Sequence, residues 1–335
     1  MPNWNTRQVG RTALRVTEIG LGTATMAGRR FKIDQGTGQA IVRAAWDAGI
    51  RYVDTAPFYG VGAAEHRVGD ALREEDRDSW VLSTKVGRLL KPHNGPGRGE
   101  DGGLSIFPFD VVYDYSHDGI MRSVEDSYQR LGLAKIDILF VHDIGVYTHG
   151  VEANAHHMKT LRDSGYKALE ELKRTGVCGA FGLGVNEKEV ILDVMEFGDW
   201  DVFLLAGRYT LLEQGPLDDL LPLCEKRGAS IVVGGPLNSG ILAGRDTWNY
   251  APAPAEIVYR VKRIQAICDA HGVPLPAAAF QFPLAHPAVC AIIPGPRSAA
   301  EFNENVPLFT HPIPGALWSD LKTAGLVRQD APVPK

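Results

Sequence analysis

Short runs of apolar residues alternate with longer segments whose apolar positions recur at helical spacing, along the whole chain. The short runs predict eight β-strands, at 17–22, 51–55, 80–85, 137–142, 179–185, 202–207, 229–234 and 288–293. The amphipathic segments predict helices at 36–48, 64–74, 119–131, 163–175, 187–197, 216–227 and 256–271. Several of these helical segments end at a glycine, the residue that most often follows a last helical turn.

Strands that alternate with helices form βαβ units, and βαβ units form a parallel sheet. Eight such units predict an α/β fold closed into a (β/α)8 TIM barrel, and one barrel domain accommodates all of residues 1–335. An open, doubly wound sheet is the alternative. It is disfavoured because the first strand-to-helix turn, GLGTATMAG, lacks the GxGxxG spacing of a dinucleotide-binding fold.

Three segments depart from the repeat. Residues 86–118 are rich in glycine and proline and predict a long loop, a length typical of functional lids. The tail 306–335 carries five prolines and is expected to be irregular. The stretch 143–162 resembles a polar loop, so His149, His156 and His157 within it are interpreted as solvated residues rather than metal ligands.

Composition narrows the choice of partners. The net charge of −5, with both signs interspersed, disfavours a nucleic-acid or anionic-membrane surface. No secretory signal and no apolar run long enough for a membrane helix is present. Cys178, Cys224, Cys268 and Cys290 are too far apart in sequence for a CxxC motif. We therefore expect reduced, buried thiols and a cytoplasmic protein.

Ionisable residues stand at the ends of three predicted strands, where barrel enzymes carry their reactive groups. Asp54 lies in VDTAPFYG, Lys85 in LSTKVG and His142 in DILFVHD, and Tyr59 follows Asp54 by five residues. A charged group at the end of an apolar strand needs a partner of opposite charge, and Asp54 and Lys85 can form an ion pair with each other. An ammonium beside Tyr59 would lower its phenol pKa and suit it to proton transfer.

These three motifs, in this order, resemble the catalytic segments of the aldo-keto reductases, and the resemblance extends from TEIGLGTA to IIPGPRSAAEFNEN. The stretch FDVVYDYSHDGIMRSVEDSYQRLGLAKIDILFVHDIG is similar to the aldose 1-dehydrogenase branch, whose members act on L-fucose or D-threo-aldoses, L-galactose and pyridoxal. The resemblance implies that Tyr59 is the general acid/base, that Asp54 and Lys85 tune it, and that His142 orients the substrate.

The resemblance also implies a nicotinamide cofactor, NAD in preference to NADP. Its expected contacts are Asn186, Tyr209, Pro236, Leu237, Asn238, Ser239, Gly240, Gly295, Arg297, Glu301 and Asn305. Glu301 favours NAD because a carboxylate suits a ribose hydroxyl and repels a phosphate, whereas Arg297 acts in the opposite direction. Val185, Ala206 and Gly234 replace polar or aromatic residues of the family pattern, and Tyr209 either compensates for them or simply packs.

The expected reaction is oxidation of a cyclic hemiacetal, a sugar or pyridoxal, to its lactone. Two alternatives stay open: an NADPH-dependent aldehyde or ketone reductase, and a non-catalytic cofactor-binding regulatory subunit. A metal-dependent barrel hydrolase is disfavoured because no HxH pair stands on an early strand. Trp248 and Tyr250 are weaker candidates for contact with the substrate or cofactor. The sequence leaves the substrate itself and the oligomeric state open.

Overall fold

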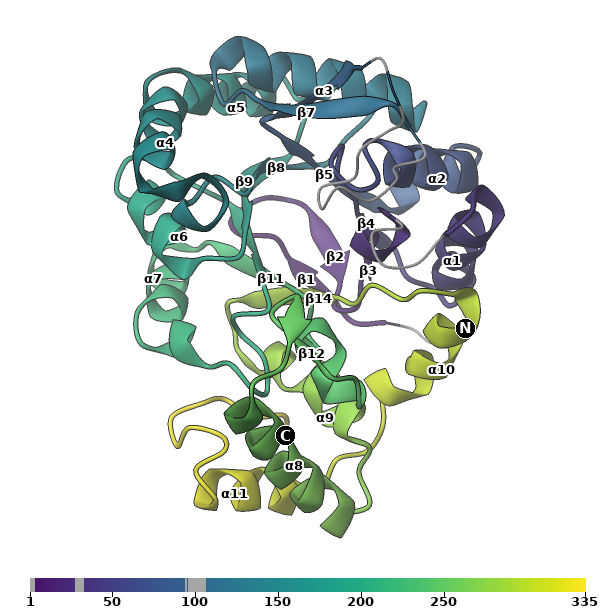
Figure 1. The fold of residues 1–335 in the computed structure, drawn as a ribbon, viewed down its shortest axis with the longest axis vertical. Coiled ribbons are helices and arrows are strands. Elements are labelled where there is room, and N and C mark those ends of the chain that lie inside the picture. The colour runs from purple at the N-terminus through teal and green to yellow at the C-terminus, as the bar shows by residue number, and fades with distance from the viewer. Residues whose placement is uncertain (1–3, 28–32, 94, 96–106) are drawn as a thin grey trace.

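Eight parallel strands form the centre of the molecule in the computed structural model, which describes residues 4–27, 33–93, 95 and 107–335 (Figure 1). In sheet order they are β3 (Leu21–Gly22), β4 (Tyr52–Asp54), β5 (Val81–Val86), β8 (Ile138–His142), β9 (Ala180–Val185), β10 (Val202–Ala206), β11 (Ser230–Gly234) and β14 (Val289–Ile293). The sheet closes where Ile19 pairs with Ile292 in parallel and the Gly20 N–H donates to the Ile292 carbonyl at 2.8 Å. The predicted (β/α)8 barrel is confirmed.

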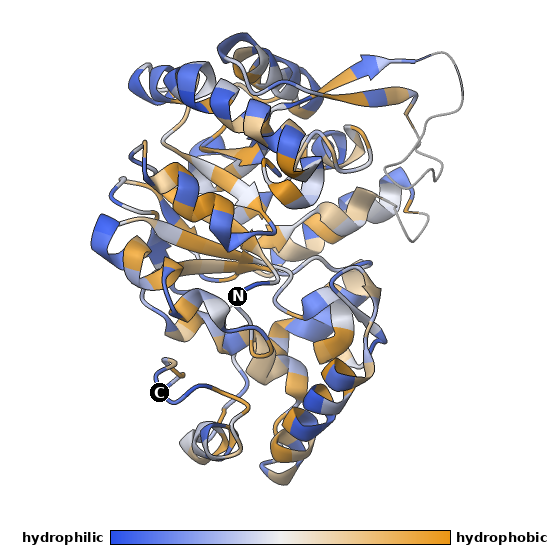
Figure 2. Ribbon diagram, turned by 60° about the vertical axis from the view of Figure 1, so that its left-hand side comes forward, coloured by the Kyte–Doolittle hydropathy of each residue, from blue (hydrophilic) through white to orange (hydrophobic). Residues whose placement is uncertain are grey.

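Helices surround this barrel (Figure 1), and several of them show hydrophobic residues on one side and hydrophilic residues on the other (Figure 2). They are α1 (Gln35–Asp47), α2 (Ala63–Leu72), α3 (His117–Leu131), α4 (Val146–Thr160), α5 (Tyr166–Arg174), α6 (Lys188–Met195), α7 (Leu220–Arg227), α8 (Ala255–Ala270), α9 (Leu275–Gln281), α10 (Ala299–Phe309) and α11 (Gly315–Thr323). Among the described residues, no helix is long and apolar enough to cross a membrane.

The first predicted strand, 17–22, is divided in the structure. Its beginning belongs to β2 (Arg15–Thr17), which pairs antiparallel with β1 (Thr6–Gln8), and only its end, β3, joins the barrel. Val9 and Val16 of this hairpin are fully buried in one cluster with inward residues near the strand starts, including Tyr52 and Ile138. The hairpin therefore closes the N-terminal end of the barrel and leaves the C-terminal end for function.

The two predicted irregular segments contain regular structure. In 86–118, β6 (Arg88–Pro92) pairs antiparallel with β7 (Phe109–Tyr113), because RLLKP and FDVVY form strands on either side of the Gly/Pro-rich connection; residues 94 and 96–106 lie outside the described part. In the tail, α10 ends at Phe309 and α11 follows. Pro314 is the N-cap of α11, so this proline starts a helix rather than preventing one.

The prediction of a polar loop at 143–162 is also wrong, because most of this segment is helical. Residues from Val146 onward form α4, which continues through a π-helical turn, Leu161–Gly165, into α5. Only Asn154 of α4 is buried, so the polar composition reflects exposure, and the backbone departs from helical geometry at Gly150, where φ is 72° and the helix is kinked. The rings of His149 and His157 lie close together, with centroids 4.3 Å apart and planes inclined by 52°.

Candidate functional site

Three ionisable side chains end barrel strands at the same end of the barrel. Asp54 is the last residue of β4, Lys85 is the penultimate residue of β5, and His142 is the last residue of β8. Tyr59 lies in the turn between β4 and α2. The structure thus brings together the four residues that the sequence singles out, because parallel strands present their C-terminal ends at one edge.

Lys85 and Asp54 form a fully buried ion pair. The Lys85 Nζ donates to both Asp54 carboxylate oxygens, at 2.8 and 3.0 Å, and to the Thr55 carbonyl at 2.9 Å. Ser83 Oγ donates to the same carboxylate at 2.7 Å. Burial raises the pKa of Asp54, and these hydrogen bonds act against that shift by favouring the carboxylate. The pair is rigidly held, since each of its charged groups has several partners.

The Lys85 ammonium lies over the ring of Tyr59, 4.8 Å from its centroid. The pKa of Tyr59 is nevertheless raised well above 10, first by burial and then by the carboxylates of Asp54 and Asp143. The expectation of a lowered phenol pKa is therefore wrong for the protein without ligands. Burial is the larger cause, because it disfavours the charged phenolate, and the Asp54 and Asp143 carboxylates add to the shift by repelling a second negative charge.

His142 is a neutral imidazole at physiological pH. Burial, and then the positive charges of Arg88 and Lys85, lower its pKa well below the usual value of about 6.5. Its ring meets that of Tyr59 edge-on, with centroids 5.8 Å apart. Its Nε2 lies 3.5 Å from a carboxylate oxygen of Asp143. A neutral imidazole beside a phenol can donate or accept one hydrogen bond at a shared substrate oxygen without adding charge.

A cavity of about 860 Å³ opens at this end of the barrel. Asp54 and Tyr59 line one part of it, and Gly295, Arg297 and Asn305 line another. Pro236, Leu237, Asn238, Ser239, Gly240 and Glu301 also line it. Most of the residues expected to contact the cofactor thus share one cavity with the tyrosine.

The residues 238–240 form a tight turn in this cavity wall. Asn238, Ser239 and Gly240 all have positive φ, at 47°, 60° and 102°. The N–H groups of Asn238 and Gly240 donate to Gly235 and Leu237 carbonyls at 2.9 Å. Two of the three N–H groups expected to approach an anion are therefore occupied within the turn. Gly22 lines the same cavity, where an added Cβ would lie 2.7 Å from the Ile293 carbonyl oxygen.

Residues 18–324 match the Aldo/keto reductase family. The chain belongs to this family. It is 46% identical to pyridoxal 4-dehydrogenase of Microbacterium luteolum, over 96% of this chain and 97% of the relative. It is 36% identical to D-threo-aldose 1-dehydrogenase of a Pseudomonas species, over 94% and 95%. An aldo-keto reductase of Bacillus halodurans, solved in its holo form, superposes with a TM-score of 0.76 at 25% identity, covering 99% of both chains.

As an aldo-keto reductase, the protein is an oxidoreductase that uses a nicotinamide cofactor, and the cavity fits such a group. Residues of β3, β4, β10, β11 and β14 line the cavity. Glycines, among them Gly22 and Gly234, stand at positions where a larger side chain would occupy part of its volume. At the end away from Tyr59, Glu301 accepts hydrogen bonds from the Arg297 N–H and guanidinium at 2.8 and 3.0 Å and pairs with Arg245. Burial opposes ionisation of Glu301, but these arginines hold its pKa below the usual value.

Two expected cofactor contacts lie outside the cavity wall. Tyr209 is fully buried and packs against Phe282 and His286, with ring centroids 5.6 and 5.7 Å away, so its interpretation as a cofactor contact is corrected to packing. The cause is its place after β10, where the chain turns back into the protein core. Asn186 lies beside the cavity and accepts a hydrogen bond from the Tyr250 hydroxyl at 3.1 Å.

The sequence did not single out Arg88 or Arg208, and singled out Tyr250 only weakly. Arg208 lines the cavity and donates to the Asn186 carbonyl and the Asn249 side chain, at 2.9 and 2.8 Å. Asp143 directly follows His142 in the motif DILFVHD, so the sequence alone indicates that Asp143 lies close to His142. Arg88 carried no comparable signal, because it lies in the segment that we expected to be a loop.

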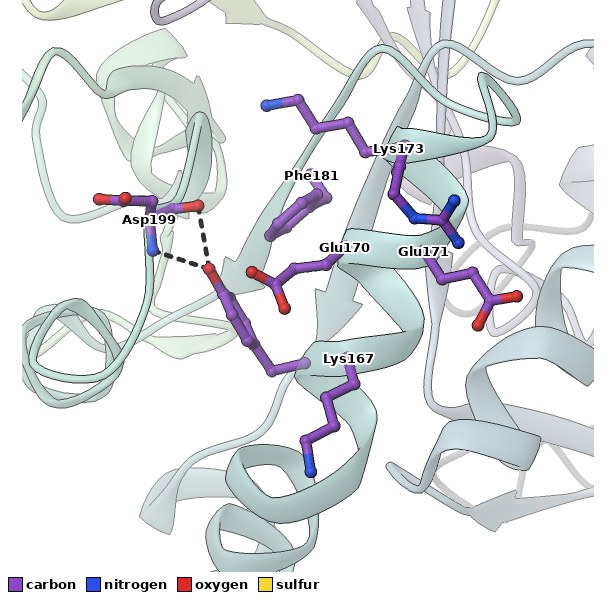
Figure 3. Close-up of a pocket in the computed structure, with 8 residues that line it drawn as sticks. Lys167, Glu170, Glu171, Lys173, Phe181 and Asp199 are labelled. Carbon is purple, nitrogen blue, oxygen red and sulfur yellow. Dashed lines mark hydrogen bonds between the residues drawn. The ribbon is translucent and has the colours of Figure 1, made fainter.

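A second cavity, of 820 Å³, lies among α5, β9 and Asp199 (Figure 3). Its side chains are largely engaged with one another: the Tyr166 hydroxyl accepts from the Asp199 N–H at 2.8 Å, and Lys173 pairs with Asp201. Phe181 is the second residue of β9, so this cavity lies toward the N-terminal end of the strands, away from Tyr59. Among the described residues, no group of three or more His, Cys, Asp or Glu side chains could hold a metal ion.

Proposed function

We propose that this protein oxidises a cyclic hemiacetal, pyridoxal or the C1 of an aldose, to the lactone with NAD(P). The observation that carries the proposal is the cluster of Tyr59, His142 and the Lys85–Asp54 pair at a dinucleotide-sized cavity, in a chain 46% identical to a pyridoxal 4-dehydrogenase. Both substrate classes carry a hydroxyl and a hydrogen on one ring carbon, so one arrangement of proton acceptor and hydride acceptor serves both.

Each residue of the cluster has a distinct part in this proposal. Tyr59 exchanges a proton with the substrate oxygen, and His142 fixes that oxygen by a hydrogen bond from its neutral ring. Lys85, held by Asp54, keeps a positive charge near the phenol ring at the moment when Tyr59 carries negative charge. The nicotinamide ring, when bound, supplies the hydride acceptor.

Reduction of an aldehyde is the second candidate, and one observation favours it. The raised pKa of Tyr59 makes the phenol, a proton donor, the prevailing form at neutral pH. Reduction needs this form, whereas oxidation needs the phenolate. The two directions share all residues of the site, so the direction in the cell depends on the cofactor and substrate concentrations.

We propose NAD rather than NADP as the cofactor. Glu301 lines the cavity and carries negative charge, which favours a ribose hydroxyl over a phosphate. Arg245 and Arg297 are both engaged with Glu301, so their positive charges are compensated. The four cysteines are unpaired and buried, which suits a reducing compartment such as the cytoplasm.

The test is a spectrophotometric screen for NADH and NADPH formation with L-fucose, L-galactose, D-arabinose and pyridoxal, run beside simple aldehydes in the reducing direction. We expect NADH formation with pyridoxal or an aldose, at a rate well above that with the simple aldehydes in reverse. Turnover of simple aldehydes alone would favour the reductase. Cofactor binding without any turnover would contradict both and favour a non-catalytic subunit.

A further inference from the structure

A buried arginine and an aspartate form an ion pair next to His142. Arg88, at the start of β6, is 3% exposed, and its Nη2 donates to Asp143 Oδ2 at 2.6 Å. The guanidinium carbon lies 3.7 Å from the centroid of the Phe58 ring. The Nε and Nη1 atoms of Arg88 are buried without a hydrogen-bond partner among the described residues. Because the desolvation cost of a buried ion pair can exceed its Coulombic gain, the presence of the pair is weak evidence for a purely stabilising role.

The Asp143 carboxylate lies beside His142 and Asn186. Its Oδ1 accepts from the Asn186 amide at 3.3 Å, and its Oδ2 lies 3.5 Å from His142 Nε2. The backbone at Asp143 has a φ of 44°, a left-handed conformation that is uncommon for a residue with a side chain and that recurs at functional sites. This conformation directs the residue after β8 toward the neighbours that hold it.

The carboxylate is held without being sealed from solvent. The Asp143 side chain is 16% exposed, whereas Arg88 behind it is almost completely buried. The Asp143 Oδ2 lies 3.5 Å from His142 Nε2, and the His142 ring meets the Tyr59 ring edge-on with centroids 5.8 Å apart, so His142 stands next to both the carboxylate and the phenol. A substrate oxygen within hydrogen-bond range of both Tyr59 and His142 therefore has the Asp143 carboxylate beside it.

We propose that Asp143, fixed by Arg88, is a specificity-determining residue that accepts a hydrogen bond from a substrate hydroxyl next to the reacting carbon. This inference rests on the proposed function, and it names the substrate class more closely: hydroxylated hemiacetals such as aldoses with a free C2 hydroxyl, or pyridoxal with its phenolic hydroxyl. A carboxylate can accept about four hydrogen bonds, so it can bind a substrate hydroxyl as well as Arg88 and Asn186.

The test compares substrates that differ only in this hydroxyl. D-arabinose is paired with 2-deoxy-D-ribose, and pyridoxal with 3-deoxypyridoxal. The wild-type protein is compared with Asp143→Ala, and with Asp201→Ala as the matched control, because Asp201 also forms an ion pair, with Lys173, at the opposite end of the barrel. Affinity of each sugar or pyridoxal compound for the NAD-loaded protein is measured together with kcat/KM.

We expect the wild-type protein to prefer the hydroxylated member of at least one pair by about 10- to 100-fold, the size expected for a hydrogen bond to a charged group. Asp143→Ala should remove most of this preference by weakening the hydroxylated substrate more than the deoxy substrate. Asp201→Ala should keep the preference. Equal losses on both members of each pair, or no preference in the wild-type protein, would overturn the proposal.

The measurements also separate this inference from the proposed function. If the hydroxylated compounds bind preferentially, through Asp143, but are not oxidised, the hydroxyl-acceptor role stands and the oxidation is refuted. If they are oxidised with no dependence on Asp143, the oxidation stands and the inference is overturned. Loss of the preference in Asp201→Ala would also overturn it, because the effect would then not be local to the site.

Discussion

The Lys85 ammonium lies 2.8 Å from a carboxylate oxygen of Asp54 and 4.8 Å from the centroid of the Tyr59 ring. The Lys85 ammonium is thus permanently paired with the buried Asp54 carboxylate. It also lies beside Tyr59, which becomes anionic only during the proposed proton transfer. Since burial and then the Asp54 carboxylate raise the pKa of Tyr59, the phenol stays protonated in the protein without ligands. This arrangement determines what substitutions at these three positions should do.

Replacement of Tyr59 by phenylalanine should abolish turnover while leaving the cofactor bound. The phenol is the proposed proton carrier, and loss of general acid–base catalysis typically costs 10²- to 10⁴-fold. The ring that Lys85 and His142 contact is retained, so the fold of the site should persist. We would measure kcat/KM and, by quenching of protein fluorescence, the Kd of the cofactor. Turnover at the wild-type rate would remove Tyr59 from the mechanism.

Oxidation should become faster as the pH rises, and reduction should not. The pKa of Tyr59 is raised above 10, so between pH 7 and 9 the phenolate is a minor form whose fraction grows about tenfold per pH unit. Oxidation requires the phenolate and should follow this growth, whereas reduction requires the phenol and should stay level. Initial rates in both directions, at saturating cofactor, give the two slopes. An oxidation rate that falls with pH over this range would contradict the assignment.

Replacing one partner of the Lys85–Asp54 pair should destabilise the protein more than replacing both partners. Lys85→Met or Asp54→Asn alone leaves a buried group without its partner, and such changes typically cost about 3–5 kcal/mol of unfolding free energy. The double variant should recover a large part of this loss, because no unpaired charge remains buried. Urea unfolding of the four proteins measures the coupling. Additive losses in the double variant would show that the two groups do not depend on each other.

The barrel and the cluster of Asp54, Tyr59, Lys85 and His142 could be predicted from sequence because both depend on local patterns. Each barrel strand is a short apolar run, and the position of Asp54, Lys85 or His142 at the end of a run fixes its place at the C-terminal edge. Helix α9 was not predicted, because LPAAAFQ is buried on most sides and shows no polar face. Helix α4 was not predicted for the opposite reason, since nearly all of it is exposed.

Other features of the site could not be predicted, because they depend on contacts between distant segments. Burial of Tyr59, followed by the carboxylates of Asp54 and Asp143, determines the direction of its pKa shift, and the sequence indicates the proximity of Lys85 but neither this burial nor the balance of charges. The ion pair between Arg88 and Asp143 joins residues 55 positions apart, one of them in a segment with loop-like composition. Tyr209 illustrates the same limit: its ring packs on α9 and residues after it, which the sequence pattern did not reveal.

Replacement of Glu301 by arginine should shift the cofactor preference from NAD toward NADP. The variant removes the carboxylate that engages Arg245 and Arg297 and adds a third guanidinium, a group that binds phosphate well. One new charge-assisted hydrogen bond is worth about 1.5–3 kcal/mol, or roughly 10- to 150-fold in the ratio of kcat/KM for the two cofactors. Glu301→Gln is the control, because it removes the charge without adding a guanidinium and should shift the ratio less. An unchanged ratio in both variants would show that Glu301 does not select the cofactor.

Replacement of Tyr209 by phenylalanine should stabilise the protein and leave cofactor binding unchanged. The Tyr209 hydroxyl is buried and has no hydrogen-bond partner among the described residues, so its removal should relieve a desolvation cost of about 1 kcal/mol or more. Tyr52→Phe is the matched control: that hydroxyl is equally buried but is hydrogen-bonded to Ser83 Oγ at 3.1 Å, so its removal should destabilise the fold. Thermal and urea unfolding measure whether each variant is more or less stable than the wild-type protein, and a cofactor titration gives the Kd. A weakened cofactor Kd in Tyr209→Phe would restore Tyr209 as a cofactor contact, since a residue that only packs in the core cannot change the affinity of a cavity that it does not line.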